Sequence, residues 1–494
     1  MAVLELPIYR SDKTNYHLVE DTKGFVQKVL IVDKPKRIAF DTETYYNPEL
    51  KAPEVISKWI QASRNNVPFG VSFYYGGQGY WVDKDIHELK PLLECGEIDK
   101  IAHNAKYDLF MLKNLGLEVK GRIWDTMLMI HLIDEEFECK MPSGGVKRSK
   151  ALKNLAFHFL GDDAHYLEDM VDEYRRILAH NRGLSKSDIS YKDVNDVNPE
   201  LMKDYAVADT EFTYRLFEIF LPELTNQQLE RAYEIDIEAT KAVIDMERNG
   251  VPVNREAMEE DEKLLTKIIR DIADIVHRDI ACKDFNYNSD KELVDVFEEL
   301  GVKWEWFTDK GELQTDKSVL KGIMNNEVYA EKARQLAGFI LDIRKAEKLL
   351  STYIIGIYPY IQEDGRVHAD FNINPNDFDK GGTKTGRMSS NNPNLQNISK
   401  KPVKLQFLDG TDIEFKPRRY FVAEEGAIMV FMDADQEEYR MLAHYGNDKA
   451  FMDLIHKGYD IHKGTASLLF HVPYEEVTDD QRSKGKTTNF GQQN

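Results

Sequence analysis

The order in which apolar patterns follow one another constrains the fold of this chain more than any other feature. Up to about residue 222, short apolar strands alternate with helices, and from about 223 to 365 apolar residues recur at three- and four-residue intervals. Strand patterns return from about residue 366 and are followed by helices. Because side chains alternate along a strand and repeat about every 3.6 residues along a helix, this order predicts an α/β domain, an α-helical region and a partial α+β region.

Individual elements can be placed within this scheme. Strands are predicted at residues 37–40, 71–76, 79–83 and 427–433. Helices are predicted at residues 152–160, 201–220, 229–249, 255–280, 291–300 and 328–357. The length of 494 residues is consistent with about three domains of ordinary size.

Composition narrows the class of protein only in part. The formal charge of −21 argues, taken alone, against a nucleic-acid partner, because phosphate binding needs positive surface. Basic stretches exist at 140–150, 400–404 and 416–419, although each alone is typical of a solvated loop. The three cysteines are far apart and lack CxxC spacing, which favours reduced thiols and a cytoplasmic protein. No signal peptide and no apolar run long enough to cross a membrane is found, so no membrane partner is expected.

Acidic residues recur in a suggestive order. Asp41 and Glu43 end an apolar strand at alternating positions, so both carboxylates face one side. Asn104 and Asp108 are four residues apart in a helical context. Each pair alone is commonplace, and an Asp-x-Glu after a strand is usually a surface turn. A set of oxygen ligands without His or Cys favours Mg²⁺ or Mn²⁺ over zinc.

With Tyr205 and Asp209, again four residues apart, this set resembles the DEDD-type 3′→5′ exonucleases of the tyrosine subgroup. The resemblance implies a ribonuclease H-like domain that binds two divalent metal ions. Asp41 would bridge both ions, and Glu43 and Asp209 would complete one of the two sites. Asp108 would support the second ion, and Tyr205 would orient the attacking water.

A second set of motifs lies downstream. KTGRMSSNNPNLQNIS at 384–399 resembles the TGRxSSxxPNLQNI signature of family A (DNA polymerase I-like) DNA polymerases. AIMVFMDADQEEYRMLAH at 427–444 resembles the first palm motif of that family, DYSQIELR. The resemblance implies that Asp433 and the carbonyl of Ala434 bind the polymerase metals and that Glu438 excludes a ribose 2′-hydroxyl. Ala434 and Asp435 stand where the family has Tyr and Ser, which leaves local packing in question.

The resemblance extends from about residue 35 to 491 and implies further contacts. Arg482, Lys486 and Phe490 share one face of a helix that would grip the incoming nucleotide, although a basic stripe on a helix is ordinarily solvated. The implied nucleotide-binding residues are Gln436, Glu438, His462, Arg482, Lys486 and Phe490. The implied DNA-binding residues are Asn104, Arg344, Lys348, Arg387, Gln396 and Asn397.

The resemblance also predicts a domain order. The exonuclease domain would span 1–222, a helical thumb 223–365, a partial palm 366–445 and the start of the fingers 446–494. The family's fingers continue beyond the point that corresponds to Asn494, and its second palm carboxylate lies further on. We therefore expect no polymerisation by this chain alone, and a second polypeptide could supply the rest. A fragment, a split gene and an intron or intein all remain open, and the lack of a 5′ nuclease domain suits phage-type members.

The leading hypothesis is a family A DNA polymerase with a proofreading exonuclease that acts in DNA replication. Its partners would be a primer–template, a single-stranded 3′ end and deoxynucleoside triphosphates, in the host cytoplasm if the gene is phage-encoded. A working exonuclease with an inactive polymerase remnant is the alternative. A non-enzymatic DNA-binding scaffold is disfavoured, because a scaffold needs no metal-binding carboxylates.

Overall fold

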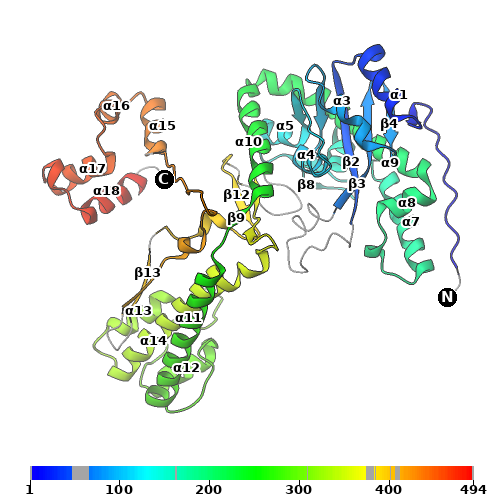
Figure 1. Cartoon of the computed structure of the whole chain (residues 1–494). Helices are drawn as coiled ribbons and strands as arrows, with labels where there is room; N and C mark the ends of the chain where they lie inside the picture. Colours follow the sequence, from blue (N-terminus) through cyan, green and yellow to red (C-terminus); the bar gives the residue numbers. More distant parts are fainter. Residues whose placement is uncertain are drawn as a thin grey trace. The chain divides into compact units, whose positions relative to one another are not determined.

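The computed structural model describes residues 3–46, 66–161, 164–308, 310–373, 383, 385–400, 402–406, 412–434 and 436–491. The chain divides into two compact units, Met1–Val422 and Ala423–Asn494 (Figure 1). The first contains an α/β part and a helical part, and the second is helical. This architecture confirms the predicted fold class.

The α/β part is built on a sheet with the strand order β1-β4-β3-β2-β5-β6. The strands are β1 (Tyr16–Leu18), β2 (Arg37–Tyr46), β3 (Asn66–Tyr75), β4 (Gln78–Val82), β5 (Asp99–Ala102) and β6 (Ile123–Asp125). Strand β2 pairs antiparallel with β3 and parallel with β5, so it lies in the interior of the sheet. Its apolar run is buried at Ile38, Ala39 and Phe40, as expected for an interior strand. The strands predicted at 37–40, 71–76 and 79–83 are thereby confirmed.

Helices pack around this sheet (Figure 1). They are α1 (Thr22–Gln27), α3 (Lys90–Leu93), α4 (Ala105–Asn114), α5 (Thr126–Ile133), α6 (Leu152–Leu160), α7 (Tyr166–Arg182), α8 (Tyr191–Val197) and α9 (Pro199–Asn226). Helix α9 contacts β2, β3 and β4, and its start is fixed by Asn198, whose side chain accepts a hydrogen bond from the Leu201 amide. A hairpin of β7 (Glu138–Lys140) and β8 (Val146–Arg148) precedes α6.

Helix α10 (Glu230–Asn249) shares the hydrophobic core of the sheet. Its Tyr233 is fully buried and stacks on Trp124 of β6, with ring centroids 5.2 Å apart. The same tryptophan contacts Phe217 of α9 at 5.4 Å. The long helices α9 and α10 therefore both pack on β6, the strand at one edge of the sheet, and stabilise it.

A second core forms in the helical part. It is made chiefly by α11 (Arg255–Ile275), α12 (Asp290–Glu299), α13 (Lys317–Asn325) and α14 (Glu331–Leu350). Short strands accompany it: β9 (Val251–Pro252), β10 (Arg366–Val367), β11 (Asp370–Asn372), β12 (Ser389–Asn391), β13 (Val403–Gln406) and β14 (Asp412–Phe415). The predicted helices 255–280 and 328–357 end in π-helical turns, at Val276–Ala281 and Ser351–Ile355.

The second unit contains α15 (Glu437–Tyr445), α16 (Lys449–His456), α17 (Ile461–Phe470) and α18 (Asp479–Gly491). Helices α17 and α18 pack closely at Gly485, where an added Cβ would come within 2.5 Å of the His462 carbonyl oxygen. Tyr439, Ile461 and Ala466 are buried in this unit.

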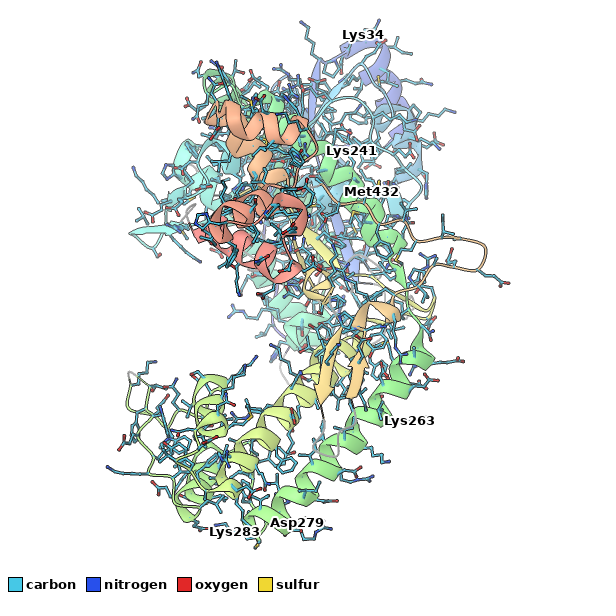
Figure 2. The ribbon with its side chains drawn as sticks, turned by 90° about the vertical axis from the view of Figure 1, so that its left-hand side faces the viewer. Lys34, Lys241, Lys263, Asp279, Lys283 and Met432 are labelled. Carbon is cyan, nitrogen blue, oxygen red and sulfur yellow. The ribbon has the colours of Figure 1, made fainter. Side chains whose placement is uncertain are left out.

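The prediction of a strand at residues 427–433 is wrong. Residues 427–434 form no strand, and Ile428, Phe431 and Met432 are 86%, 72% and 91% exposed (Met432 is labelled in Figure 2). The apolar run has the composition of a buried strand, but a strand is stable only when a neighbouring strand accepts its hydrogen bonds. In the described part of the chain, no strand lies beside this segment as a sheet neighbour.

Two further sequence expectations can be compared with the structure. Cys95, Cys139 and Cys282 are all free thiols, as their spacing predicted. In the described part of the chain, no helix has the length and apolar character needed to span a membrane.

Candidate active site

The centre of the candidate site is strand β2. Asp41 and Glu43 occupy alternating positions on it, and Glu43 is 7% exposed. The pairing of β2 with β3 shifts register directly after Glu43. Such a shift bends a strand and redirects its side chains, and it is common beside active sites. The two carboxylates are therefore held on one side of a buried strand at the point where the sheet is distorted.

Asp108 reaches this strand from helix α4. Its Oδ1 accepts hydrogen bonds from the Thr42 amide at 2.9 Å and from the Thr42 hydroxyl at 2.6 Å. Thr42 lies between Asp41 and Glu43 in the sequence. Its two hydrogen bonds therefore hold Asp108 beside the part of β2 that carries both acids. Asp108 is 2% exposed.

The start of α4 differs from the prediction. Asn104 lies one residue before the helix, with a left-handed backbone (φ 62°), and so does not share a helix face with Asp108. Asparagine tolerates this conformation. The carboxylate of Asp125 accepts hydrogen bonds from the Asn104 amide at 3.0 Å and the Ala105 amide at 2.8 Å, which fixes the helix start.

Tyr205 and Asp209 lie one turn apart on α9, and both are 7% exposed. The ring of Tyr205 stacks on Tyr191 of α8, with centroids 5.6 Å apart and planes 15° apart. The Arg175 guanidinium lies 5.0 Å from the Tyr191 ring centroid, and its Nε donates to the Ile189 carbonyl at 2.8 Å.

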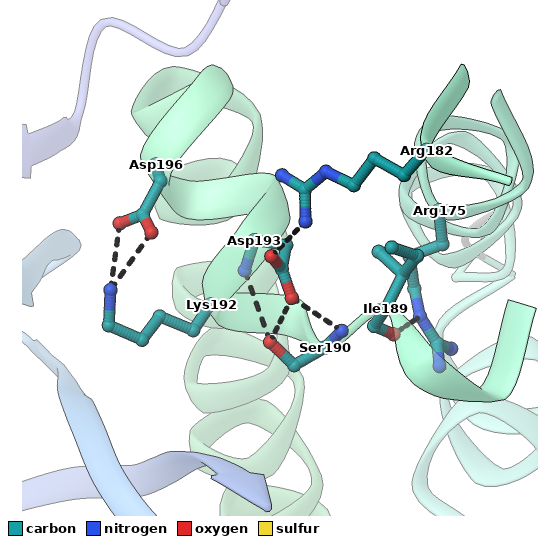
Figure 3. Close-up of polar contacts among 7 residues, drawn as sticks. All are labelled: Arg175, Arg182, Ile189, Ser190, Lys192, Asp193 and Asp196. Atoms are coloured by element: carbon teal, nitrogen blue, oxygen red, sulfur yellow. Dashed lines mark hydrogen bonds and ion pairs between the residues drawn. The ribbon is translucent and has the colours of Figure 1, made fainter. Parts of the chain in front are cut away.

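Helix α8 is anchored by the contacts in Figure 3. Ser190 and Asp193 form a capping box, in which each side chain accepts from the other's backbone amide. Arg182 pairs with Asp193, and Lys192 pairs with Asp196 at 2.9 Å. This anchoring positions Tyr191, and through it Tyr205.

Burial and mutual repulsion raise the proton affinity of the acids. Burial raises the pKa of Asp41 well above its ordinary value, and the neighbouring carboxylates raise it further. Burial and the charge of Asp209 raise the pKa of Glu43 to about 8. Burial raises the pKa of Asp108 to about 7, against the lowering effect of the Thr42 hydrogen bonds. Asp41 and Glu43 therefore lie close enough to Asp108 and Asp209 for the like charges to disfavour their ionised forms.

One cation lies among them. Lys153 of α6 forms an ion pair with Asp209, and its ammonium lies 4.6 Å from the centroid of the Tyr205 ring. The charge of Lys153 lowers the pKa of Asp41, Glu43 and Asp209, whereas burial raises all three.

The donor set has the chemistry of a divalent-metal site: buried carboxylates with excess negative charge and oxygen ligands only. No three acidic, histidine or cysteine side chains of the described ranges form a ready-made metal site, however. Two of the carboxylates have other partners. Asp108 Oδ1 is engaged by Thr42, and Asp209 Oδ1 by Lys153. The set fits a bound ion once Asp108 and Asp209 release Thr42 and Lys153, or once each carboxylate rotates to present its other oxygen.

The predicted nucleotide-binding residues belong to the second unit, where several have internal partners. The Arg482 guanidinium pairs with Asp460, with Nη2 2.6 Å from Oδ2. His462 is 4% exposed, and its Nδ1 lies 3.1 Å from the Asn489 amide nitrogen. Gln436 Oε1 accepts from the Ile461 amide at 2.8 Å.

The remaining predicted polymerase residues are on the surface. Asp433, Ala434, Glu438 and Lys486 are exposed, and the side chain of Phe490 lies outside what the structure describes. The two metal ligands predicted here, Asp433 and Ala434, therefore follow no strand.

The predicted DNA-binding residues of the helical part divide in the same way. Lys348, Arg387, Gln396 and Asn397 are exposed. Arg344 instead donates to the Thr315 side chain at 2.9 Å and lies 3.6 Å from Asp290. Their roles on DNA stay predictions.

Sequence reasoning missed four residues that shape the site: Thr42, Asp125, Lys153 and Tyr191. The position of Lys153 could have been noticed in the sequence. It lies three residues before Ala156 on the predicted helix, so the two share a face, and Ala156 is fully buried. Thr42 donates its amide and its hydroxyl to a carboxylate 66 residues away, and no local pattern indicates that contact. Asp125 directly precedes α5 as its N-cap, which a local pattern can indicate, but its contact with the start of α4 arises only from the fold.

Comparison with known proteins identifies two families along the chain. Residues 16–225 match the family model described as 3′-5′ exonuclease, and residues 255–492 match the one described as DNA polymerase family A. The DNA polymerase I of Chloroflexus aurantiacus is 31% identical over 82% of this chain and 40% of its own length. That of Pseudomonas aeruginosa is 27% identical over 97% and 48%, and the DNA polymerase of Bacillus phage SP01 is 27% identical over 82% and 45%. The chain thus spans less than half the length of these relatives.

A solved structure described as the POL domain of Pol1 from M. smegmatis in complex with DNA primer-template and dNTP is also similar. It superposes with a TM-score of 0.67 over 96% of this chain and 71% of that one, at 22% identity, which establishes a shared fold.

The sheet, the acid cluster and the model matches together define an exonuclease domain joined to a polymerase-type region. The chain belongs to the family A DNA polymerases that carry a 3′-5′ exonuclease domain.

Proposed function

We propose that this chain removes nucleotides from the 3′ end of a DNA strand at the acid cluster around β2. The observation that carries the proposal is the burial of Asp41, Glu43, Asp108 and Asp209 in one setting, where burial raises the pKa of Asp41 and of Glu43 and the charges of Asp108 and Asp209 raise both further. Folding gains nothing from gathering four like charges, since burying uncompensated charge is costly. A cluster of this kind is expected where function requires bound cations.

The same four carboxylates would hold two Mg²⁺ or Mn²⁺ ions. When bound, the ions supply a hydrolytic nucleophile and neutralise the charge that develops on the phosphodiester. Thr42 would keep Asp108 oriented, and the buried strand would limit the movement of Asp41 and Glu43.

Tyr205 is assigned the orientation of the attacking water. Burial raises the pKa of its hydroxyl well above 10, so it stays protonated and acts as a hydrogen-bond donor or acceptor rather than as a base. Stacking on Tyr191 restricts its ring. Orientation of a nucleophile by a fixed group is one of the larger contributions to rate that a protein can make.

For the polymerase-type region we propose binding of a primer–template and of deoxynucleoside triphosphates. The metal ligands would be Asp433 and Ala434, and Lys486 would contact phosphate. The alternative, an exonuclease with an inactive polymerase remnant, is favoured by two observations. The segment that carries Asp433 forms no strand, and Arg482 is paired with Asp460.

One experiment distinguishes these functions. The chain is incubated with Mg²⁺ and a primer–template that has a mismatched 3′ end, with and without deoxynucleotides. We expect trimming of the primer by the wild type. In Asp41→Ala the rate should fall by at least about 1,000-fold, because a water molecule in place of the carboxylate lacks the negative charge that holds the metal ions. Primer extension would support polymerase activity, whereas trimming without extension would support the alternative. DNA binding without trimming would support the scaffold and contradict the proposal.

A further inference from the structure

Lys153 lies in the exonuclease site, and the proposed chemistry gives it no role. It lies in the first turn of α6, and its side chain is 13% exposed. Lysine is rarely buried to this extent unless its charge is paired. Here the partner is Asp209, whose side chain is 10% exposed.

The surroundings of the ammonium favour a cation. It lies 4.6 Å from the centroid of the Tyr205 ring and 6.0 Å from that of Phe212. Aromatic faces attract cations at these distances. The ammonium is thus held by a carboxylate and two rings that all belong to α9.

Its charge also acts beyond its direct partner. Four carboxylates gather here, and Lys153 opposes their repulsion at Asp41, Glu43 and Asp209. One ammonium cannot balance four acids, but it occupies a lone-pair position on Asp209 that a metal ion would need.

We propose that Lys153 is an internal counter-cation, which holds Asp209 while the site is metal-free and has to release that carboxylate when a divalent ion binds. This inference rests on the proposed function, because it takes the acid cluster to be the metal site. Lys153 is a positioning residue: it stabilises the empty cluster and weakens the affinity for metal. The exchange raises the concentration of divalent ions at which the site fills, because the metal has to displace the ammonium from Asp209.

The test uses the full chain and needs no DNA. Lys153→Met removes the charge and keeps an apolar side chain of similar length, and Lys153→Arg keeps the charge. Lys241→Met is the matched control, because Lys241 (labelled in Figure 2) pairs with Glu238 at 2.6 Å on the exposed face of α10. Affinity for Mn²⁺ is measured by titration calorimetry at one pH for all four proteins, and thermal unfolding is followed in EDTA.

We expect Lys153→Met to bind Mn²⁺ about tenfold more tightly than the wild type, since the competing cation is gone. In EDTA it should unfold about 4 °C lower, because the carboxylates then lack their counter-charge. Lys153→Arg should restore the unfolding temperature, and Lys241→Met should match the wild type in both measurements.

Unchanged or weaker Mn²⁺ binding by Lys153→Met, with an unchanged unfolding temperature in EDTA, overturns the inference. Digestion of DNA by the wild type is measured alongside. If the wild type binds Mn²⁺ and digests DNA while Lys153→Met behaves like it, the inference fails and the proposed function stands. If the wild type neither binds nor digests, the proposed function fails, and the inference fails with it as an account of metal exchange.

Discussion

Lys106 and Glu247 form a buried ion pair between helix α4 and helix α10, with Nζ 2.6 Å from Oε1. The pair binds both backbone groups of one residue of β11: Lys106 donates to the Phe371 carbonyl at 2.7 Å, and the Phe371 amide donates to Glu247 at 2.6 Å. The side chains are only 15% and 4% exposed. The helix that carries Asp108 is thereby tied to a strand that follows the helical part in sequence.

Removing one partner should destabilise the chain strongly. Lys106→Met leaves the Glu247 carboxylate buried with reduced compensation, and we expect a loss of about 3 kcal/mol in the urea unfolding of the first unit. The double variant with Glu247→Gln should lose less than the sum of the single changes. Lys113→Met breaks an exposed pair with Asp245 on the same two helices and should cost under about 1 kcal/mol. Equal costs for the two lysine variants would contradict this account.

Asp125 is predicted to stabilise two helices at once. Besides the start of α4, its carboxylate caps α5 by accepting from the Met127 amide at 2.9 Å and the Leu128 amide at 3.3 Å. Asp125→Ala should therefore cost about 3 kcal/mol, more than an ordinary N-cap, and should slow DNA digestion because α4 positions Asp108.

The matched control is Asp316→Ala. Asp316 caps α13 alone, through the Ser318 and Val319 amides. We expect a cost of about 1 kcal/mol and unchanged digestion. Both variants are compared by urea unfolding and by the rate at which a labelled strand is shortened. Digestion at the wild-type rate by folded Asp125→Ala would show that the α4 cap is unimportant for activity.

Thr42 should affect activity through Asp108. Thr42→Val has nearly the same shape but loses the hydroxyl that donates to Asp108 at 2.6 Å. We expect digestion to slow about tenfold, since loss of one hydrogen bond leaves the carboxylate less well oriented. Thr42→Ser keeps the hydroxyl and should stay within about twofold of the wild type. The measurement is the single-turnover rate at saturating Mg²⁺, and equal rates for the two variants would refute the assigned role.

The buried His131 should make the free energy of unfolding depend on pH. Burial lowers its pKa to about 4, with a further contribution from the positive charge of Lys150. In the unfolded chain the pKa is about 6.5, so between these values the unfolded state binds a proton that the folded state does not. Stability should therefore fall as the pH falls from about 6.5 to 4, by up to about 3 kcal/mol.

His131→Phe isolates this contribution. The variant should be less sensitive to acid than the wild type over the same range, because it has no proton to bind. Urea unfolding at pH 7.5 and pH 4.5 gives the difference. The interpretation is wrong if wild type and variant lose the same stability between the two pH values.

The sequence predicted best those features that depend on local pattern. Strand β2 with its two acids and helix α6 with its bounds were both identified, because a buried strand or helix leaves a periodic apolar signature. The same signature misled at residues 427–433. That run indicates a preference for burial in a sheet, but it carries no information on whether strands lie alongside.

Contacts between distant segments could not be predicted in this way. The Thr42–Asp108 bond joins positions 66 residues apart, and the Lys153–Asp209 pair joins positions 56 apart. Arg344 was expected on DNA from a family resemblance, yet the structure places it against Thr315. The local sequence around a basic residue on a helix does not distinguish a contact with the DNA backbone from a contact within the protein.

The central claim is that the acid cluster digests DNA from the 3′ end. The most direct measurement follows a 5′-labelled single strand incubated with the chain and Mg²⁺, and resolves its length at single-nucleotide steps. We expect a ladder that shortens progressively from the 3′ end, no products in EDTA, and none with Glu43→Gln or Asp209→Asn. A strand that stays at full length with the wild type, internal cleavage, or an unchanged ladder with those two variants would contradict it.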